Sequence, residues 1–324
     1  MNAHVQRLPV VVIYPHTRCN CRCTMCDIWK RDAAESIEPE RFARYLDEFA
    51  GLGVEWIVFS GGEPLMHPQL DLLCSMAKAR GLRVTILTTG LLLERHASWI
   101  VSGVDDVIVS LDGPPETHDR IRGVTGAFDA LARGARALRE RRPAYPISAR
   151  CTVQKANCRL LGDTVSAAES VGLDAVSFLA ADVSSDAFDH VPGGGTQLER
   201  RVALDASDIG ALAAEVEALI WRGAAGAFVR ESADKLRRIV RHFRATLGEC
   251  EAVAPRCNAP WVSAVIETDG TVRPCFFHRP VGNIASECLS AVVNGPQAVA
   301  FRAGLDVASN DTCRKCVCSL YVEP

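Results

Sequence analysis

The 324-residue sequence lacks any uninterrupted run of 18 apolar residues, which excludes a membrane-spanning helix. It also lacks an excess of basic charge, because 36 Lys and Arg face 39 Asp and Glu and leave a formal charge of −3. Nucleic-acid binding usually requires a strongly basic balance, so we expect no such partner. Residues 1–9 contain one Arg and no apolar stretch of a signal peptide, which favours a cytoplasmic protein.

Disulfide bonds are a further expected absence. With 48% apolar residues, a chain of this length builds its own hydrophobic core and needs no covalent cross-links. The sequence nevertheless contains fourteen cysteines. In a reducing cytoplasm, clustered cysteines bind metals or perform redox chemistry more often than they form disulfides.

Short β-branched segments alternate with amphipathic segments over the first two thirds of the chain. This alternation predicts an α/β fold with a parallel sheet and right-handed crossovers. Six units favour a partial (β/α)6 barrel over a full eight-unit barrel; a doubly wound sheet is the alternative. The predicted strands are Val10–Tyr14, Trp56–Ser60, Arg83–Thr88, Asp106–Leu111, Ile147–Val153 and Ala175–Leu179.

The pattern changes after residue 224, so we expect a barrel domain over residues 1–224 and a small cysteine-rich domain over residues 225–324. The second domain begins with a basic helix over Ser232–Leu247, whose charges favour a solvated face. A hairpin follows, with strands Val262–Glu267 and Thr271–Phe276 around Asp269-Gly270. The Gly-rich stretch Ser184–Gln197 is predicted to be a long loop, either a functional loop or a linker.

Three cysteines follow the first predicted strand in the spacing C-x3-C-x2-C: Cys19, Cys23 and Cys26. Thiolates are ligands for zinc or for iron–sulfur clusters. Three of them can hold three corners of a 4Fe–4S cluster and leave one iron open to another ligand. A structural zinc site needs a fourth ligand, which Cys21 or His16 could supply.

Two further motifs follow later predicted strands. The second strand ends in Gly61-Gly62-Glu63-Pro64, where the glycines let the backbone approach a ligand closely. The fourth strand ends in Ser110-Leu111-Asp112-Gly113, followed by Arg122, whose guanidinium suits a carboxylate. A tight turn and a salt-bridged surface loop are the structural alternatives for these two motifs.

Taken together, the three motifs resemble those of the radical S-adenosylmethionine (radical SAM) superfamily. The resemblance implies a 4Fe–4S cluster on Cys19, Cys23 and Cys26, whose open iron chelates SAM and delivers the electron that cleaves it. It implies that Gly61-Gly62-Glu63-Pro64 receives the SAM ammonium group. Further binding roles follow from the same resemblance: Ser110 for the SAM ribose, Arg122 for its carboxylate, Met25 beside the adenine and Asp112 facing the substrate.

A second cysteine set lies near the C-terminus: Cys257, Cys275, Cys313 and Cys316. Four thiolates fit a structural zinc or a fully ligated 4Fe–4S cluster equally well. The pattern C-x12-G-x4-C followed by C-x2-C resembles the twitch module, the single-cluster relative of the SPASM domain, which implies one auxiliary 4Fe–4S cluster. Cys318 competes with Cys316 as the fourth ligand.

The reaction implied by this resemblance is hydrogen abstraction by a 5′-deoxyadenosyl radical. Dehydrogenation would send a second electron to the auxiliary cluster, whereas epimerisation would need a thiol hydrogen donor, for which Cys151 and Cys318 are the candidates. A flavodoxin or ferredoxin would supply electrons. We expect a small polar substrate (a sugar, aminocyclitol or nucleoside), handled by Asp112, His118 and the 184–197 loop, as in 2-deoxy-scyllo-inosamine dehydrogenase-type enzymes.

Two alternatives remain open. The first is a peptide-modifying radical SAM enzyme; such enzymes often carry an extra N-terminal peptide-binding domain, and only eighteen residues precede Cys19 here. The second is a protein that binds a zinc ion or an iron–sulfur cluster without catalysis.

Overall fold

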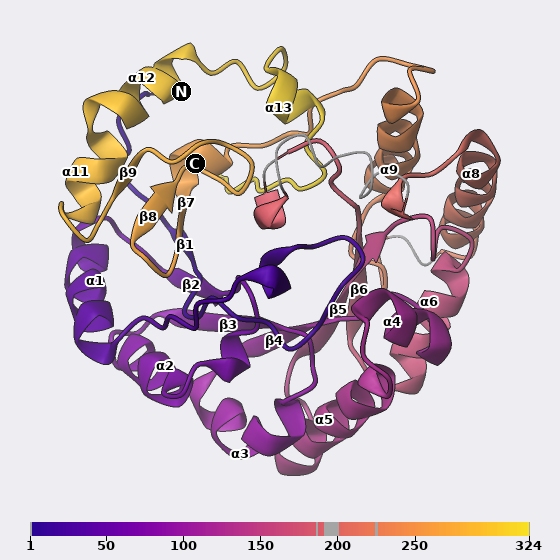
Figure 1. Ribbon diagram of the computed structural model, residues 1–324, viewed down its shortest axis with the longest axis horizontal. Coiled ribbons are helices and arrows are strands. Elements are labelled where there is room, and N and C mark those ends of the chain that lie inside the picture. Colours follow the sequence, from indigo (N-terminus) through magenta and orange to yellow (C-terminus); the bar gives the residue numbers. More distant parts are fainter. Residues whose placement is uncertain (1, 186, 191–200, 224–225, 324) are drawn as a thin grey trace.

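The computed structural model describes residues 2–185, 187–190, 201–223 and 226–323. These residues form a nine-stranded sheet with the strand order β6-β5-β4-β3-β2-β1-β7-β8-β9 (Figure 1). Strands β1 to β6 pair in parallel along the sheet, which confirms the α/β class and the partial barrel. These strands are β1 Val10–Ile13, β2 Trp56–Phe59, β3 Arg83–Thr88, β4 Asp106–Ser110, β5 Ile147–Val153 and β6 Ala175–Ala180.

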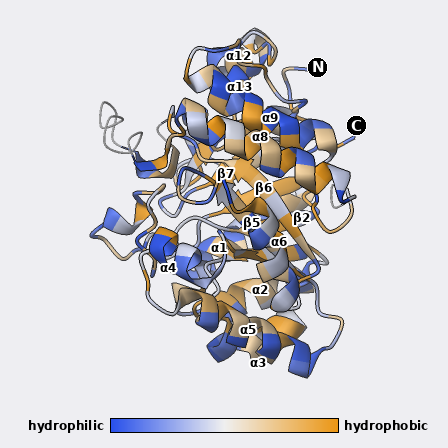
Figure 2. Ribbon diagram, turned by 90° about the vertical axis from the view of Figure 1, so that its right-hand side faces the viewer, coloured by the Kyte–Doolittle hydropathy of each residue, from blue (hydrophilic) through white to orange (hydrophobic). Residues whose placement is uncertain are grey.

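Helices connect the parallel strands and cover the outer face of the curved sheet, as Figure 1 shows. Their apolar faces pack on the strands; α1, for example, buries Phe42, Tyr45, Leu46 and Phe49. The helices of the barrel are α1 Pro39–Gly51, α2 Leu70–Ala79, α3 Leu93–Gly103, α4 Pro115–Arg122, α5 Ala127–Arg141, α6 Leu161–Ser170 and α8 Ala206–Trp221. Figure 2 shows the strands largely hydrophobic and the helices of mixed colour, as expected for a sheet enclosed by amphipathic helices.

The C-terminal part is joined to the barrel through the sheet itself. Strand β7 (Ser263–Ile266) pairs in parallel with β1, with Val10 opposite Ser263, and β8 (Thr271–Arg273) and β9 (Gly282–Asn283) continue the sheet antiparallel. The predicted hairpin is therefore present, but it extends the barrel sheet. The remaining helices are α9 Ala233–Thr246, α10 Ala259–Val262, α11 Leu289–Asn294, α12 Pro296–Gly304 and α13 Asp311–Arg314.

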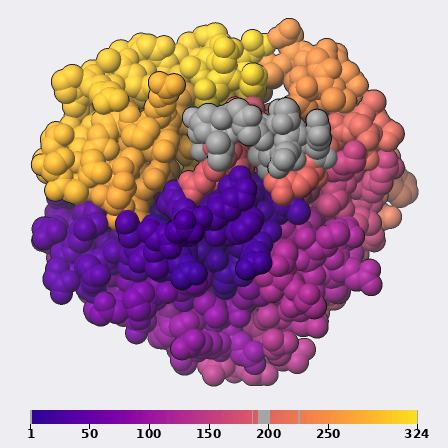
Figure 3. All heavy atoms as spheres, viewed as in Figure 1, coloured from indigo at the N-terminus to yellow at the C-terminus, as the bar shows by residue number. Residues whose placement is uncertain are grey.

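The last residues of the chain also return to the barrel. Leu320 and Val322 pack with the cluster formed by Val10, Val12 and Val265 on β1 and β7. The division at residue 224 thus separates two sequence patterns that share one sheet and one packed interior. Figure 3 shows the indigo N-terminal segment and the orange and yellow C-terminal segment on the same face of the molecule.

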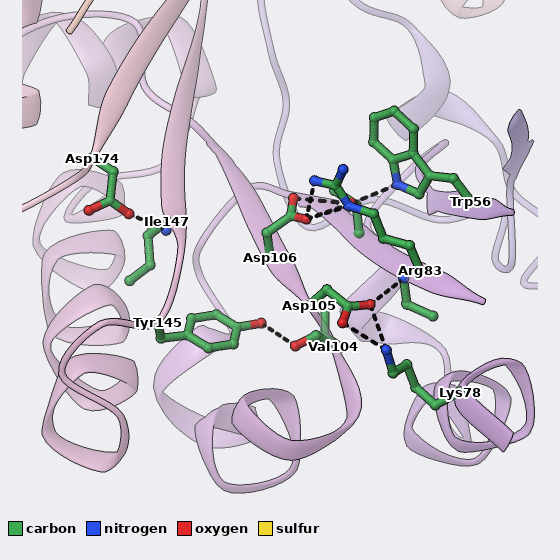
Figure 4. A network of polar contacts seen from close by, with 11 residues as sticks. Trp56, Lys78, Arg83, Val104, Asp105, Asp106, Tyr145, Ile147 and Asp174 are labelled. Atoms are coloured by element: carbon green, nitrogen blue, oxygen red, sulfur yellow. Dashed lines mark hydrogen bonds and ion pairs between the residues drawn. The ribbon is translucent and has the colours of Figure 1, made fainter. Parts of the chain in front are cut away.

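Acidic residues fix the beginnings of the parallel strands (Figure 4). Asp105 accepts hydrogen bonds from the backbone N–H of Val84 at 2.7 Å and from Lys78 Nζ at 2.7 Å. Asp174 accepts one from the backbone N–H of Ile147 at 2.8 Å. In barrels of this kind the N-terminal ends of the strands serve stability, and the functional residues lie at the opposite ends.

Candidate functional site

The cysteine loop follows β1 and is held on one side by the Gly-Gly motif after β2. Glu63 donates a backbone hydrogen bond to the carbonyl oxygen of Arg18 at 2.9 Å, directly before Cys19. A Cβ at position 62 would lie 2.2 Å from the same oxygen, and a Cβ at position 61 would lie 2.7 Å from the Tyr14 ring. Only glycine therefore lets the second strand end so close to the cysteine loop.

The end of α4 holds the same loop on its other side. The backbone N–H groups of Arg22 and Thr24 donate to the carbonyl oxygens of Arg122 and Ile121 at 2.8 and 3.0 Å. Gly123 follows with φ +64°, and a Cβ there would lie 2.7 Å from the Arg22 oxygen. Arg122, which was expected from the sequence to lie on the loop before the next helix, is instead the last residue of a helix that begins after Pro114 and ends at a left-handed glycine.

All three cysteines of the loop line one cavity of about 180 Å³. Gly61, Gly62, Ser110, Arg122 and Met25 line it as well, so five of the seven predicted SAM-binding residues meet the cysteines there. The other residues of its wall are Cys21, Ile28, Trp29, Ser60, Leu87, Thr88, Thr89, Arg150, Thr152, Leu179, Asp182, Phe188 and Val317. The ends of strands β2 to β6 thus contribute to a single cavity.

Two thiols of this loop are shifted in opposite directions: burial raises the pKa of Cys26, whereas Cys23 is prepared for metal coordination. A hydrogen bond from Cys21, and then the charge of Arg122, lowers the pKa of Cys23 to about 7 against the effect of burial. A lowered pKa favours the thiolate, which is the form that ligates iron. Within the described residues, no three His, Cys, Asp or Glu side chains converge as they would on a single metal ion. The fit to a cluster therefore rests on thiol chemistry and on the cavity that the three cysteines share.

The two other motif residues, Glu63 and Pro64, are buried away from this cavity. The Glu63 carboxylate accepts hydrogen bonds from Thr88 Oγ1 at 2.8 Å and from the backbone N–H groups of Thr89 and Leu65 at 2.6 and 3.0 Å. Burial raises the pKa of Glu63, and these hydrogen bonds oppose the shift. The Glu63 side chain therefore joins the ends of β2 and β3, whereas the glycines present the backbone to the cavity.

Arg122 and Asp112 form a buried ion pair with 2.6 Å between Nη2 and Oδ2. Asp112 Oδ1 also accepts the backbone N–H of Thr152 at 2.9 Å, and Arg122 Nη1 lies 3.6 Å from Cys23 Sγ. Burial raises the pKa of Asp112, and the Arg122 charge opposes this shift. The sequence expected Asp112 to face the substrate and Arg122 to bind a carboxylate of SAM. In the structure Asp112 does not line the cavity, and the Arg122 charge is already balanced by Asp112.

His118 lies behind this ion pair and is fully buried. Its Nδ1 accepts the backbone N–H of Asp112 at 3.2 Å. Burial, and secondly the Arg122 charge, lowers the pKa of His118 to about 3, so the ring is neutral. His118 therefore holds the backbone of Asp112 through this hydrogen bond and does not line the cavity.

Strand β5 contributes two cavity residues that the sequence reasoning missed, Arg150 and Thr152. Along this strand Ile147, Ala149, Cys151 and Val153 are buried, whereas the residues between them are partly exposed. Alternate residues of a strand point to opposite faces. The alternation of Ser148, Arg150 and Thr152 with apolar residues was the signal that could have placed them inside the barrel.

The second set of cysteines also comes together. A charge on Cys257 raises the pKa of Cys275, Cys313 and Cys316, although burial is the largest cause of each shift. Cys275 follows β8, and its pKa is raised to about 12; Cys313 lies in α13, and its pKa is raised to about 11. These residues come from three separate segments, which the sheet and α13 bring together.

Two side chains of other types border this set. His278 Nε2 lies 3.3 Å from Cys313 Sγ, and Arg238 on α9 donates to the carbonyl oxygen of Cys316 at 2.9 Å. Cys318 lies near as well, because its charge raises the pKa of Cys316 after burial has done so. Both Cys316 and Cys318 thus remain candidates for the fourth cysteine ligand of the predicted auxiliary cluster.

The two predicted hydrogen donors have different surroundings. Cys151 is fully buried on β5 and its Sγ lies 3.5 Å from Asn157 Nδ2. Cys318 lines a small cavity of about 90 Å³ that it shares with Arg150 and Val317, which also border the cysteine-loop cavity. The predicted 184–197 loop lies partly outside the described residues; its described part contributes Phe188 to the cysteine-loop cavity.

Residues 13–153 match the radical SAM superfamily, and residues 257–317 match the SPASM iron–sulfur cluster-binding domain. A Fe-coproporphyrin III synthase of Methanosarcina barkeri is 37% identical over 155 residues, which cover 47% of this chain and 38% of that protein. A PqqA peptide cyclase of Granulibacter bethesdensis is 29% identical over 160 residues, which cover 48% of this chain and 42% of that protein. The chain thus matches less than half the length of these curated relatives.

Among solved structures, SuiB of Streptococcus suis bound to S-adenosylmethionine is similar in fold, with a TM-score of 0.70 and 17% identity. The similarity covers 98% of this chain and 74% of SuiB. SuiB bound to its precursor peptide SuiA gives a TM-score of 0.69 at the same identity and covers 98% and 72% of the two chains. The two matched domains imply SAM and two iron–sulfur clusters as cofactors. The chain therefore combines a radical SAM domain with a SPASM domain and belongs to the radical SAM superfamily.

Proposed function

We propose that this protein is a radical SAM enzyme that cleaves SAM in the cavity of the cysteine loop and modifies a ribosomally made precursor peptide. The observation that carries SAM cleavage is the convergence of Cys19, Cys23 and Cys26 with Gly61 and Gly62 on one cavity. When bound there, the cluster and SAM supply a 5′-deoxyadenosyl radical. The protein's own part is to position the reactants, as in other enzymes whose cofactor performs the difficult chemistry.

The residues of the cavity have separate roles in this proposal. Gly61 and Gly62 present backbone groups to the SAM ammonium group, and Ser110 at the end of β4 is placed for the ribose. Arg122, held by Asp112, keeps positive charge beside Cys23 and so favours its thiolate. Met25 adds an apolar contact for the adenine.

The C-terminal set Cys257, Cys275, Cys313 and Cys316 is proposed to hold the auxiliary cluster. A cluster with four protein ligands has no open iron, so we assign it to electron transfer. This suits an oxidative modification, in which the substrate radical loses a second electron. If the product instead requires a hydrogen atom, Cys318 is the better placed donor, because it lines a cavity that shares Arg150 with the SAM cavity, whereas Cys151 is fully buried.

The peptide substrate is supported by the proteins to which this chain is similar. One curated relative is named a PqqA peptide cyclase, and SuiB has been solved with a precursor peptide. A small polar sugar, aminocyclitol or nucleoside, which the sequence favoured, has no comparable support. A small-molecule substrate of another kind is the second candidate, because a relative with 37% identity is named a Fe-coproporphyrin III synthase.

The test is an anaerobic assay of the reconstituted protein with SAM and dithionite. We expect 5′-deoxyadenosine to form, and we expect a short peptide encoded beside the gene to lose or gain hydrogen, detected as a mass change. Absence of 5′-deoxyadenosine in a protein with full iron content would contradict SAM cleavage. If the peptide stays unmodified and an iron porphyrin is turned over, the substrate is the second candidate, a small molecule, and not a peptide.

A further inference from the structure

We infer that Arg150 is the carboxylate-binding residue of the SAM and substrate cavity. Arg150 lies in the middle of β5, on the strand face that also presents Ser148 and Thr152. It lines the cysteine-loop cavity and two neighbouring cavities, one at the beginnings of the strands and one beside Cys318. Its side chain therefore stands where three cavities meet inside the barrel.

The Arg150 guanidinium has no counter-ion among the residues that the structure describes. No Asp or Glu oxygen of these residues lies within 4.0 Å of it, in contrast to the many surface arginines that form ion pairs. The Nε atom of Arg150 is buried and has no hydrogen-bond partner among the described residues. A buried donor on a charged group is costly to leave unpaired. A ligand that supplies an anionic oxygen would satisfy it.

Arg122 and Glu231, two charged residues that share a cavity with Arg150, already have partners of their own. The Nε of Arg122 is also buried without a partner among the described residues, but its guanidinium has a counter-ion, Asp112, at 2.6 Å. Glu231 lines one cavity together with Arg150, but its two carboxylate oxygens accept hydrogen bonds from Ser177 Oγ and the backbone N–H of Phe178 at 2.8 and 2.9 Å. Among the described residues, Arg150 on β5 is thus a cation without a counter-ion beside the cysteine loop.

The chemistry of a guanidinium defines the ligand class. Its planar donor pair matches a carboxylate and forms two parallel charged hydrogen bonds with it. Two sources are available in the proposed function, on which this inference rests: the carboxylate of SAM and a carboxylate of the substrate. Both would lie in the cavity that also contains the cysteines, and therefore close to the cluster they hold.

Trifluoroacetate is a suitable probe, because it is a carboxylate whose ¹⁹F signal broadens near a paramagnetic centre. The experiment uses the anaerobically reconstituted full chain reduced with dithionite, with measured iron content and far-ultraviolet circular dichroism for each variant. Arg150→Gln removes the charge, and Arg150→Lys keeps it without the planar donor pair. Arg230→Gln is the matched control, since Arg230 is exposed and lines the cavity at the beginnings of the strands but not the cysteine-loop cavity.

We expect saturable broadening of trifluoroacetate with wild type and Arg230→Gln, and at least about tenfold weaker binding with Arg150→Gln, as for loss of a charged hydrogen bond. If SAM then displaces trifluoroacetate, the carboxylate at Arg150 is that of SAM. If both bind together, it is that of the substrate. Equal broadening by wild type and Arg150→Gln, with iron content intact, would overturn the inference. Failure of the proposed function appears differently, as missing iron or missing 5′-deoxyadenosine in the wild type.

Discussion

The two cysteine sets of this protein offer the same ligand atom, the thiol sulfur, in different surroundings. Cys19, Cys23 and Cys26 lie on one continuous loop that borders a cavity, with Arg122 beside Cys23. The C-terminal cysteines come from three segments, and burial raises the pKa of Cys275, Cys313 and Cys316. In the first set burial likewise raises the pKa of Cys26, but a hydrogen bond from Cys21 and then the charge of Arg122 lower the pKa of Cys23 to about 7.

The difference matches two kinds of iron–sulfur chemistry. A three-thiolate loop beside a cavity leaves one iron for an exchangeable ligand, whereas four thiolates from separate segments enclose a cluster and leave room only for electron transfer. In the proposed function, these surroundings, more than the number of cysteines, distinguish the cluster that binds SAM from the cluster that transfers electrons.

The largest expected effect separates the two sets by function. Replacing Cys23 with Ala removes a ligand of the open cluster, so we expect 5′-deoxyadenosine formation to fall to the level of a reaction without enzyme. About four irons should remain in the C-terminal cluster. Cys74→Ala is the control, since Cys74 is fully buried in the core outside both sets. Undiminished SAM cleavage by the Cys23 variant would break the comparison.

Replacing Cys257 with Ala tests the other set. We expect the iron content to fall from about eight to about four atoms per chain while some SAM cleavage survives, because the open cluster is intact. Peptide modification should be lost, since the substrate radical has no electron acceptor. Iron analysis and product mass spectrometry measure both effects; full turnover of this variant would argue that the auxiliary cluster is dispensable.

The third prediction concerns the buried ion pair between Asp112 and Arg122, which lies beside Cys23 of the N-terminal cysteine set. Asp112→Ala leaves Arg122 buried without its counter-ion, so we expect the free energy of unfolding to fall by about 3–5 kcal/mol. Glu94→Ala removes an ion pair with Arg133 whose side chains are 56% and 54% exposed, and should cost less than about 1 kcal/mol. Chemical denaturation of the two variants measures the difference, and equal losses would contradict a structural role for the buried pair.

The smallest expected effect is a pH dependence of the free energy of unfolding, caused by His118 next to Asp112. The folded pKa of His118 is about 3, against 6.5 for the unfolded chain. Between pH 6.5 and pH 3 the unfolded chain binds a proton at His118 that the folded protein does not bind. Neutral His118 therefore contributes fully to the free energy of unfolding above pH 6.5, and this contribution is lost as the pH falls. At pH 5 the loss is roughly 2 kcal/mol.

His118→Asn retains a hydrogen-bond acceptor for the backbone N–H of Asp112 and removes the titration. We therefore expect its stability to change by about 2 kcal/mol less than that of wild type between pH 7 and pH 5. An identical pH dependence of the two proteins would show that His118 is not held neutral in the fold.

Much of the fold could be read from the sequence because its signals are local. The β-branched alternation of 147–153 and 83–88 predicts strands with the observed bounds. The pairing of β7 with β1 joins residues about 250 positions apart, and no local pattern specifies it. For the same reason the sequence predicted the C-terminal hairpin but not its pairing with the barrel sheet.

The site was predictable in its motifs and less so in its side-chain directions. Five of the seven SAM-binding candidates line the same cavity as Cys19, Cys23 and Cys26, and their role there stays a prediction. Asp112 follows the end of β4, where strand alternation no longer fixes the direction of a side chain, and it pairs with Arg122 instead of facing the cavity. Arg150 was missed because the alternation along β5 separates the two faces of the strand but does not say which distant loop lies beside them.

The central claim is that one cluster binds SAM and the other does not. Electron paramagnetic resonance of the dithionite-reduced protein during a SAM titration tests it most directly. We predict two signals, of which SAM shifts only the one that is absent from the Cys23→Ala variant, while the signal absent from Cys257→Ala stays unchanged. A single signal in the wild type, or two signals that SAM leaves unaltered, would contradict the account.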